Sequence, residues 1–425
     1  MIDDLTSRGA LSGAASLVLL VGVVVGWWAW TTRILKERRE TPIRILVTGS
    51  RGKSSTVRLL HAALAEGGYR PYGKVTGTAA AEITTDGTEV GTFRLGAPSV
   101  LETFDTMRRA FRADPRADSL TFECMAISPA LIELLADRMV DPGIVVITNV
   151  KLDHLEEEGT TLAEIAASLG GAIRPGSLVV TGESDPEALG ALERQAEERA
   201  AELVICRTGD LPADSLERLP LIHPQNVGLT LAVTRSLGIA DYTAIAGMAG
   251  ASREPGDQEV WRRQMAGLDA TWSDLGAVND PESLGQALDG LDLPVAAGAP
   301  RIGMVFGRWD RPLRALEFAG FLLPGRFDGV MVAGGPVRPV REALVAAGWD
   351  TDRVVVSPAA AALGPSWEHE LAALVERVAP GARQVGLVSL ENEHDGLADR
   401  VRDFFHGGSR LDGGFNGGSG VADGT

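Results

Sequence analysis

A glycine-rich segment at residues 48–55 combines the residue types that bind phosphate groups. It follows an apolar, β-branched stretch at residues 43–48 and precedes a helix-like stretch at residues 53–66. A strand, a tight glycine turn and a helix N-terminus together hold phosphate with backbone N–H groups and the positive end of the helix dipole. The segment therefore predicts a phosphate-binding loop. Its residues are Thr48, Gly49, Ser50, Arg51, Gly52, Lys53, Ser54 and Ser55.

The side chains of this loop have separate expected roles. Lys53 would reach the β- and γ-phosphates of a nucleotide, and the hydroxyl group of Ser54 or Ser55 would bind Mg²⁺. The full pattern G-x-x-x-x-G-K-[ST] is not met, because Val47 stands where the first glycine would be. A shorter G-x-x-G-K-S match also occurs by chance, so the prediction depends on the strand and helix that flank the loop.

Two further expected strands end in polar residues. The first ends at Glu123 and the second at Asn149, and Lys151, Asp153 and His154 follow the second. In an open parallel sheet, ligands bind at the carboxyl ends of the strands, so we expect these side chains beside the phosphate-binding loop. A carboxylate and an imidazole near a triphosphate suit one or two divalent cations. Alternatively, Glu123 pairs with an arginine and His154 caps a helix.

The composition limits the class of protein. The 425 residues suffice for two or three domains, and a hydrophobic content of 45% indicates a folded chain. The formal net charge of −17 argues against sequence-independent binding of nucleic acid, which depends on an excess of lysine and arginine. With only Cys124 and Cys206, the chain is not a disulfide scaffold, and we expect Cys124 to be a small buried residue.

The N-terminal region has the pattern of a membrane span. Residues 9–32 carry no charge, and as a helix they would extend about 36 Å, enough to cross the hydrocarbon of a bilayer. Three tryptophans and then four basic residues follow at one end: Trp27, Trp28, Trp30, Arg33, Lys36, Arg38 and Arg39. Because basic flanks stay in the cytoplasm, we predict a single-pass cell-membrane protein with its N-terminus outside and its catalytic domains cytoplasmic. The alternative is a cleaved signal peptide, which the length of the span and the position of the positive charge disfavour.

The order and wording of these motifs resemble the Mur ligase superfamily. The phosphate-binding loop is similar to its ATP loop, the T-G-x-x-G-K-[ST] variant, and residues 123–126 and 148–155 look like its next two motifs. In detail these segments resemble the poly-γ-glutamate synthase branch, the PgsB/CapB type. Asn226 resembles an asparagine that lies near the adenine, and residues 279–283 look like the N-x-P-x-S segment that opens the C-terminal domain.

The resemblance implies an α/β architecture in four parts. Residues 1–40 would form a transmembrane anchor with a basic juxtamembrane segment, and residues 41–260 a P-loop ATP-binding central domain of the Mur ligase type. Residues 261–406 would form a smaller Rossmann-like C-terminal domain, and residues 407–425 a Gly-rich disordered tail. A membrane helix directly before the ATP loop, in place of a nucleotide-sugar domain, is typical of the poly-γ-glutamate branch.

The same resemblance implies a ligase that uses ATP to activate the γ-carboxyl group of glutamate as an acyl phosphate and then forms γ-glutamyl amide bonds. The cofactors would be ATP and Mg²⁺ (or Mn²⁺), and residues 49–55 and Asn226 would bind the nucleotide. The catalytic residues would be Lys53, Glu123 and His154. The metal ligands would be Ser54, Ser55, Glu123 and His154.

One departure from the family pattern affects the metal site. Many Mur ligases carry a carbamylated lysine a short distance after the histidine, where this chain has only apolar residues and a serine at 166–169. No lysine occurs anywhere after Lys151. A second metal ion must therefore be held in another way or be absent.

Anionic substrates require cationic side chains. Arg70, Lys74 and Arg94 occur near the first expected strands, and we expect some of them, with Asn149 and Lys151, to bind the carboxylates of glutamate or poly-γ-glutamate. Alternatively, the arginines only keep the surface soluble.

A polymer made on the cytoplasmic side has to cross the membrane, and a single helix cannot form a channel. The resemblance therefore implies a multi-span membrane partner and an exported accessory protein. Three alternatives stay open. They are another Mur-type ligase that adds glutamate to a different acceptor, a regulatory P-loop ATPase that controls membrane partners, and a scaffold whose metal site has decayed.

Overall fold

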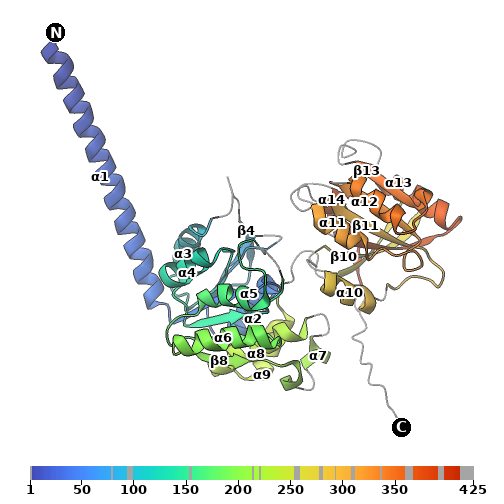
Figure 1. Cartoon of the computed structure of the whole chain (residues 1–425), viewed down its shortest axis with the longest axis horizontal. Helices are drawn as coiled ribbons and strands as arrows, with labels where there is room; N and C mark the ends of the chain where they lie inside the picture. The colour runs from blue at the N-terminus through green and yellow to red at the C-terminus, as the bar shows by residue number, and fades with distance from the viewer. Residues whose placement is uncertain are drawn as a thin grey trace. The chain divides into compact units, whose positions relative to one another are not determined.

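The computed structural model describes residues 2–77, 80–92, 99–152, 156–212, 215–219, 222–252, 259–276, 281–291, 293–307, 312–335, 337–358, 367–390 and 397–411. The chain forms two compact units, unit 1 (residues 1–253) and unit 2 (residues 254–425), each with its own sheet (Figure 1). The domain boundary expected after residue 260 falls inside a strand of unit 2, β9 (Glu259–Met265).

Unit 1 is built on an eight-stranded sheet in the order β4-β3-β2-β5-β1-β6-β7-β8. Its strands are β1 (Ile43–Thr48), β2 (Pro71–Val75), β3 (Ala81–Ile83), β4 (Glu89–Gly91), β5 (Ser119–Glu123), β6 (Ile144–Ile147), β7 (Leu178–Thr181) and β8 (Glu202–Ile205). Six strands are parallel, and β3 and β4 add antiparallel pairs at one edge. The central strand β1 pairs with β5 and β6, so the carboxyl ends of these three strands meet at one edge of the sheet.

Helices cover both faces of this sheet, as expected for apolar parallel strands. The helices are α2 (Lys53–Glu66), α3 (Glu102–Ala113), α4 (Pro129–Leu134), the π-helix η1 (Leu135–Val140), α5 (Leu162–Leu169), α6 (Pro186–Glu198), α7 (Ser215–Arg218), α8 (Pro224–Ser236) and α9 (Asp241–Ala249). One core contains apolar residues of α2, α8 and α9, including Val57, Leu231 and Ile245. The other contains residues of α3, η1, α5 and α6, including Phe104 and Ile165.

A 39-residue helix, α1 (Ile2–Glu40), precedes the sheet. Its segment Ser16–Glu40 is long and apolar enough to cross a membrane, by length and composition. The apolar side chains from Leu17 to Trp28 are exposed, whereas Ile34 and Arg38 are buried in unit 1. The part of α1 nearest the sheet contacts α3, which lies beside it in Figure 1.

Unit 2 is a second α/β layer structure with a seven-stranded sheet in the order β13-β12-β11-β14-β10-β9-β15. Its further strands are β10 (Leu268–Leu275), β11 (Arg301–Gly307), β12 (Gly329–Gly334), β13 (Val354–Pro358), β14 (Gln384–Leu390) and β15 (Ser409–Arg410). Its helices are α10 (Pro281–Gly290), α11 (Pro312–Ala319), α12 (Val337–Ala346), α13 (Trp367–Val378) and α14 (Leu397–His406). Five strands are parallel, and β9 and β15 are antiparallel at one edge.

The sequence predicted a disordered tail from residue 407 onward, but the structure has a strand, β15, at Ser409–Arg410. β15 pairs with β9, and the backbone N–H of Leu411 donates to the carbonyl oxygen of Val260 at 2.9 Å. Leu411 also packs against an apolar core of unit 2. The prediction was wrong for these residues because the edge of β9 offers backbone groups that the chain end can pair with. Residues 412–425 lie outside the described part of the chain.

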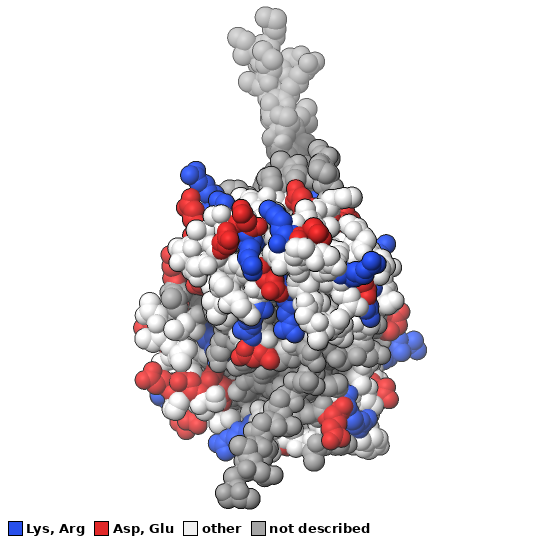
Figure 2. All heavy atoms as spheres, turned by 90° about the vertical axis from the view of Figure 1, so that its right-hand side faces the viewer, with Lys and Arg blue, Asp and Glu red and all other residues white. Residues whose placement is uncertain are grey.

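Acidic and basic side chains are interspersed on the face of the molecule shown in Figure 2. Ion pairs between neighbouring side chains occur within each unit, for example Arg235–Asp241 at 2.7 Å in unit 1 and Arg338–Glu342 at 3.1 Å in unit 2. The excess of acidic residues is therefore not gathered into one negative field on that face.

Candidate active site

The segment between β1 and α2, residues 49–52, lies in the loop that the sequence predicts to bind phosphate. Gly49 has a φ angle of +123° and Gly52 one of +80°, both in the region that favours glycine. A Cβ atom on Gly49 would lie 2.2 Å from Oγ1 of Thr148, and one on Gly52 would lie 2.9 Å from Oδ1 of Asn226. The path of the loop therefore requires glycine at both positions.

Lys53, the first residue of α2, lies over this loop. Its Nζ donates to the carbonyl oxygens of Gly49, at 2.6 Å, and Ser50, at 3.3 Å. The ammonium group is thus held at a helix N-terminus, where backbone N–H groups and the helix dipole also favour an anion. This is where a lysine neutralises the phosphates of a bound nucleotide.

Glu123 lies at the carboxyl end of β5, where it pairs with Val47 of β1, and it is buried. Its Oε2 accepts hydrogen bonds from the Ser54 hydroxyl group, at 2.8 Å, and from the backbone N–H of Thr76, at 2.6 Å. Of the two serines considered as metal ligands, it is Ser54 that contacts Glu123. The structure thus brings the carboxylate to the phosphate-binding loop.

The donor set at this point fits a divalent metal ion. A serine hydroxyl and a carboxylate are hard oxygen ligands of the kind that Mg²⁺ or Mn²⁺ takes together with waters and phosphate oxygens. Among the described residues, no group of three or more His, Cys, Asp or Glu side chains could hold a metal ion. His154 and Asp153 lie outside the described residues, so the expected metal ligands that the structure brings together here are Ser54 and Glu123.

Asn149, at the carboxyl end of β6, fixes the backbone of the phosphate-binding loop. Its carbonyl oxygen accepts from the N–H of Ser50 and its Oδ1 from the N–H of Arg51, both at 3.0 Å. Two residues further on, the N–H of Lys151 donates to the Ser50 hydroxyl group at 2.9 Å. These contacts place Asn149 and Lys151 directly behind the loop.

The start of α8 closes the other side of the loop. Asn226 is buried there, beside Gly52. The neighbouring Gln225 accepts a hydrogen bond from Nδ2 of Asn149 at 3.2 Å and donates to the carbonyl oxygen of Gly182 at 2.6 Å. Gln225 therefore links the loops that follow β6 and β7 in front of α8.

Sequence reasoning missed Glu183, which follows β7 and is buried. Its Oε2 accepts from the N–H of Val150 at 2.5 Å, and its Oε1 accepts from the N–H groups of Ser184 and Asp185, both at 2.7 Å. Because Val150 lies between Asn149 and Lys151, this carboxylate anchors the segment that supports the phosphate-binding loop. The signal that could have found it is the one used for Glu123, an acidic residue just after a buried β-branched strand.

The three basic residues proposed for the substrate have different positions. Lys74 is buried in the carboxyl-terminal half of β2, with its Nζ 3.7 Å from the Glu102 carboxylate. Arg70 precedes β2, and its guanidinium group binds the Asp114 carboxylate, with Nε at 2.8 Å. Arg70 is therefore at the amino edge of the sheet, opposite the phosphate-binding loop, and the expectation that it lies near the site was wrong. Arg94 lies outside the described residues.

Cys124, next to Glu123, is a packing residue, as expected. Its side chain is buried in the apolar core of unit 1, and this burial raises the pKa of the thiol to about 11. The thiolate form is therefore scarce near neutral pH, so the residue lacks the character of a nucleophile.

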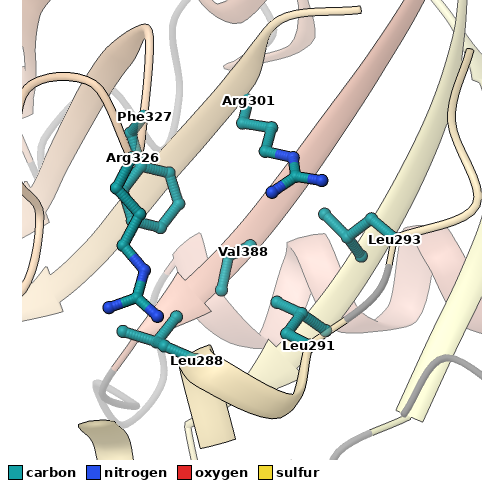
Figure 3. A pocket seen from close by; sticks show the side chains of 7 residues that line it. All are labelled: Leu288, Leu291, Leu293, Arg301, Arg326, Phe327 and Val388. Atoms are coloured by element: carbon teal, nitrogen blue, oxygen red, sulfur yellow. The ribbon is translucent and has the colours of Figure 1, made fainter. Parts of the chain in front are cut away.

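Unit 2 contains a small cavity of about 20 Å³, room for about one water molecule. It is lined by Leu288, Leu291, Leu293, Arg301, Arg326, Phe327 and Val388 (Figure 3). Arg301 is the first residue of β11, and Arg326 forms an ion pair with Asp289 at 2.5 Å. The cavity thus lies toward the amino end of that strand, whereas ligands of open parallel sheets bind at the carboxyl ends, and we assign it no catalytic role.

The sequence matches two protein families, one in each unit. The Mur ligase middle domain covers residues 47–205, and the poly-gamma-glutamate synthase CapB C-terminal domain covers residues 263–407. The capsule biosynthesis protein CapB of Bacillus anthracis is 29% identical over 340 residues, which cover 78% of this chain and 72% of that protein. In both units the chain thus matches proteins of the CapB branch of the Mur ligase superfamily. It is accordingly an ATP-dependent amide ligase.

Other CapB and Mur-type proteins support the same placement. The PGA synthase CapB of Bacillus subtilis (strain 168) is 31% identical over 251 residues, or 58% of this chain and 61% of that protein. Among solved structures, the folylpolyglutamate synthase of Mycobacterium tuberculosis complexed with ADP has a TM-score of 0.61 at 18% identity. That similarity covers 90% of this chain and 94% of the other, and it shows a shared α/β fold.

Proposed function

We propose that this CapB-family ligase uses ATP to join the γ-carboxyl group of glutamate, or of a growing chain, to the amine of another glutamate. The observation that carries the proposal is the hydrogen bond between Ser54 and Glu123 beside Lys53, in a chain of this family. The names of the two Bacillus relatives, a capsule biosynthesis protein and a PGA synthase, support poly-γ-glutamate as the product.

The chemistry requires activation because a carboxylate is a poor acyl donor. An oxygen of the γ-carboxylate attacks the γ-phosphorus of ATP, the bond from that phosphorus to the β,γ-bridging oxygen breaks, and ADP leaves. The incoming amine then attacks the acyl carbon, the bond to the phosphate oxygen breaks, and an amide and inorganic phosphate form as the amine loses its proton to solvent. Lys53 and the backbone N–H groups of the loop would neutralise charge on the transferring phosphoryl group.

Ser54 and Glu123 would hold Mg²⁺ or Mn²⁺, which supplies charge neutralisation at the phosphates. The fold is also similar to the bifunctional folylpolyglutamate synthase/dihydrofolate synthase of Yersinia pestis, solved with AMPPNP and a Mn ion (TM-score 0.59, 17% identity, 85% of this chain and 89% of that chain). We propose His154 as the ligand of a second ion, and Asn226 as a contact of the nucleotide base. Lys74 and Lys151 are proposed to face the carboxylates of the substrate.

We further propose that α1 anchors the ligase in the cell membrane, with its N-terminus outside and both units in the cytoplasm. The apolar segment within Ser16–Glu40 and the basic residues at its end support this orientation. Export of the polymer would then require a multi-span membrane partner and an exported accessory protein, because one helix forms no channel.

The first experiment measures phosphate release from ATP by the detergent-solubilised full chain with Mg²⁺, with and without glutamate. We expect release that depends on glutamate and falls by at least about 100-fold in Lys53→Ala, because the mutant lacks the charge that stabilises the transferring group. Lys36→Ala, which removes an exposed lysine from α1, is the matched control and should keep the activity of the unmodified protein.

Different outcomes would point to different functions. Release that ignores glutamate and other carboxylic acids would favour a regulatory ATPase, and release that needs a second acceptor would favour another glutamate ligase. If membranes that also contain the partner proteins released no phosphate, the ligase proposal would fail. Mass spectrometry of the product, for γ-linked glutamate, identifies the bond that is made.

A further inference from the structure

The last three turns of α1 are packed into unit 1 along one helix face. Trp30, Ile34 and Arg38 recur at intervals of four residues, and the last two are 2% and 5% exposed. Ile34 belongs to the same apolar core as Phe104 of α3, and Trp30 packs against that core. Arg33 lies on another face and stays exposed. This part of α1 is therefore a component of unit 1 and not a tether.

The side chain of Arg38 connects α1 to η1 of unit 1 by hydrogen bonds. Its Nη1 donates to the carbonyl oxygens of Arg138, at 3.0 Å, and Met139, at 2.9 Å, in the last turn of η1. The carbonyl groups at a helix end lack partners within the helix, so a buried guanidinium group there satisfies them. Breaking this contact would leave a buried charge and two carbonyl groups without these hydrogen bonds.

The junction between α1 and the sheet is short and braced. Only residues 41 and 42 separate the helix from β1. The side chain of Arg44, in β1, donates to the carbonyl oxygen of Thr41 at 2.8 Å and to that of Asp141 at 2.7 Å. The helix cannot swing at this point without losing these contacts, so the direction of α1 is fixed relative to the sheet.

A series of aromatic rings marks the level at which the helix leaves the unit. The ring centroids of Trp27 and Trp30 are 4.8 Å apart, and those of Trp30 and Phe104 are 6.4 Å apart. Trp27 and Trp28 are largely exposed, as interfacial tryptophans of a membrane span would be. Leu101, one turn before Phe104, is 52% exposed. The first turn of α3 therefore lies near the level of the expected interfacial tryptophans.

We infer that α1 holds unit 1 against the lipid surface in one orientation, with Leu101 and the first turn of α3 in the headgroup region. This inference rests on the membrane anchoring proposed above. The charges agree with it, because the exposed basic residues of this stretch, Arg33, Lys36 and Arg39, outnumber its two acidic residues and would favour anionic headgroups. The acidic side chains of the first turn of α3 have cationic partners, Lys74 for Glu102 and Arg108 for Asp105.

The test uses the full chain in nanodiscs of phosphatidylcholine and phosphatidylglycerol, some of whose lipids carry a quencher on the headgroup. A fluorescent dye is attached to Leu101→Cys in a Cys206→Ser background, in which the remaining Cys124 is buried. Tyr242→Cys, in α9, is the matched control, since this side chain is 72% exposed but belongs to a helix on the other core of unit 1. We expect the dye at residue 101 to be quenched at least about threefold more than the dye at residue 242.

A second variant tests whether residue 101 is quenched because unit 1 is held in one orientation or only because the chain is attached to the membrane. A flexible Gly-Ser insertion of ten residues between Trp28 and Ala29 keeps the apolar segment and the packed turns but disconnects them. We expect the insertion to lower quenching at residue 101 to the level seen at residue 242. Equal quenching at both positions in the uninterrupted chain, or quenching at 101 that survives the insertion, would overturn the inference.

The same nanodiscs distinguish this inference from the proposed function. Glutamate-dependent phosphate release is measured on each sample. If release is absent while the difference in quenching persists, the ligase proposal fails and the docked orientation stands. If the protein leaves the nanodiscs during purification, both the anchoring and the docked orientation are contradicted, whatever the activity.

Discussion

Three backbone N–H groups donate to the Glu183 carboxylate, so this position requires a side chain that accepts hydrogen bonds at both of its terminal atoms. The donors are Val150, Ser184 and Asp185, which approach both oxygens of the side chain. A carboxylate accepts from all three, whereas an amide would direct its own NH₂ group at one or two of them. The loop that supports the phosphate-binding loop thus depends on a side chain at residue 183 that only accepts hydrogen bonds.

At the residue scale we predict the effect of Glu183→Gln. The amide leaves at least one buried N–H unpaired, which costs about 1–3 kcal/mol of stability and loosens the segment behind the phosphate-binding loop. We expect the KM for ATP to rise about tenfold, while the turnover at saturating ATP falls no more than about threefold. Steady-state kinetics of phosphate release at several ATP concentrations checks this split.

Glu187→Gln is the control for that variant, because Glu187 is exposed on the first turn of α6 only four residues away. It should leave both constants unchanged. A Glu183→Gln enzyme that lost stability but kept the KM for ATP would show that Glu183 supports the fold without positioning the loop.

Residues whose roles follow from local sequence were the ones that could be predicted. The order glycine, lysine, serine after a strand identifies the loop, and the structure brings Glu123 to Ser54 as expected. Glu183 and Gln225 acquire their roles only from contacts across the sheet edge, between segments that are far apart in the chain. Glu183 does follow a buried β-branched strand, as Glu123 does, whereas no local pattern distinguishes Gln225 from other polar residues at helix starts.

At the element scale, α2 is tied to the turn between β3 and β4 by a buried imidazole. The Nε2 of His61 lies 3.0 Å from the carbonyl oxygen of Thr84, and His61 is 3% exposed. Burial lowers the pKa of His61 below its ordinary value of 6.5, although the backbone contacts and the carboxylates of Glu89 and Asp86 act in the opposite direction.

This shift gives a pH dependence of defined sign. Below pH 6.5 the unfolded chain binds a proton at His61 that the folded chain resists, so the stability is fully present above that pH and is lost as the pH falls. Between pH 7.5 and 5.5 we expect the thermal midpoint of unit 1 to fall more in the unmodified protein than in His61→Gln. Thermal unfolding of the full chain measures this, with the transition of unit 1 identified by its shift on adding an ATP analogue. An identical fall in both proteins would contradict the prediction.

Strands and helices with a clear pattern of apolar residues could be predicted from the sequence. A strand that forms only by pairing with the edge of a distant strand could not. The strand and helix expected at residues 43–48 and 53–66 match β1 and α2. β15 was missed because its residues form a strand only through the edge of β9, and Gly-rich sequence gives no sign of that partner. The packing of α1 was missed because apolar residues at its end fit a membrane or a protein core equally well.

At the scale of the whole molecule, the packed turns of α1 predict how the chain can be shortened. A chain that begins at residue 29 keeps Trp30, Ile34 and Arg38, whereas one that begins at residue 41 loses all three. Loss of one buried aliphatic side chain and of the guanidinium contacts should cost unit 1 about 3 kcal/mol or more. Chemical denaturation of both proteins in mild detergent checks the difference, and equal stabilities would refute it.

The position of β1 in the sheet has a consequence for synthesis of the protein. Among the strands of its sheet, β1 is the first to be translated, yet it is a central one, with β5 on one side and β6 on the other. Neither neighbour exists until the chain has grown past Ser119, and the second only appears after Ile144. The apolar strand β1 therefore stays unpaired, next to the newly made α1, until β5 and β6 have been translated. Nascent chains of this protein should recruit chaperones in that interval, before the sheet grows outward from its centre.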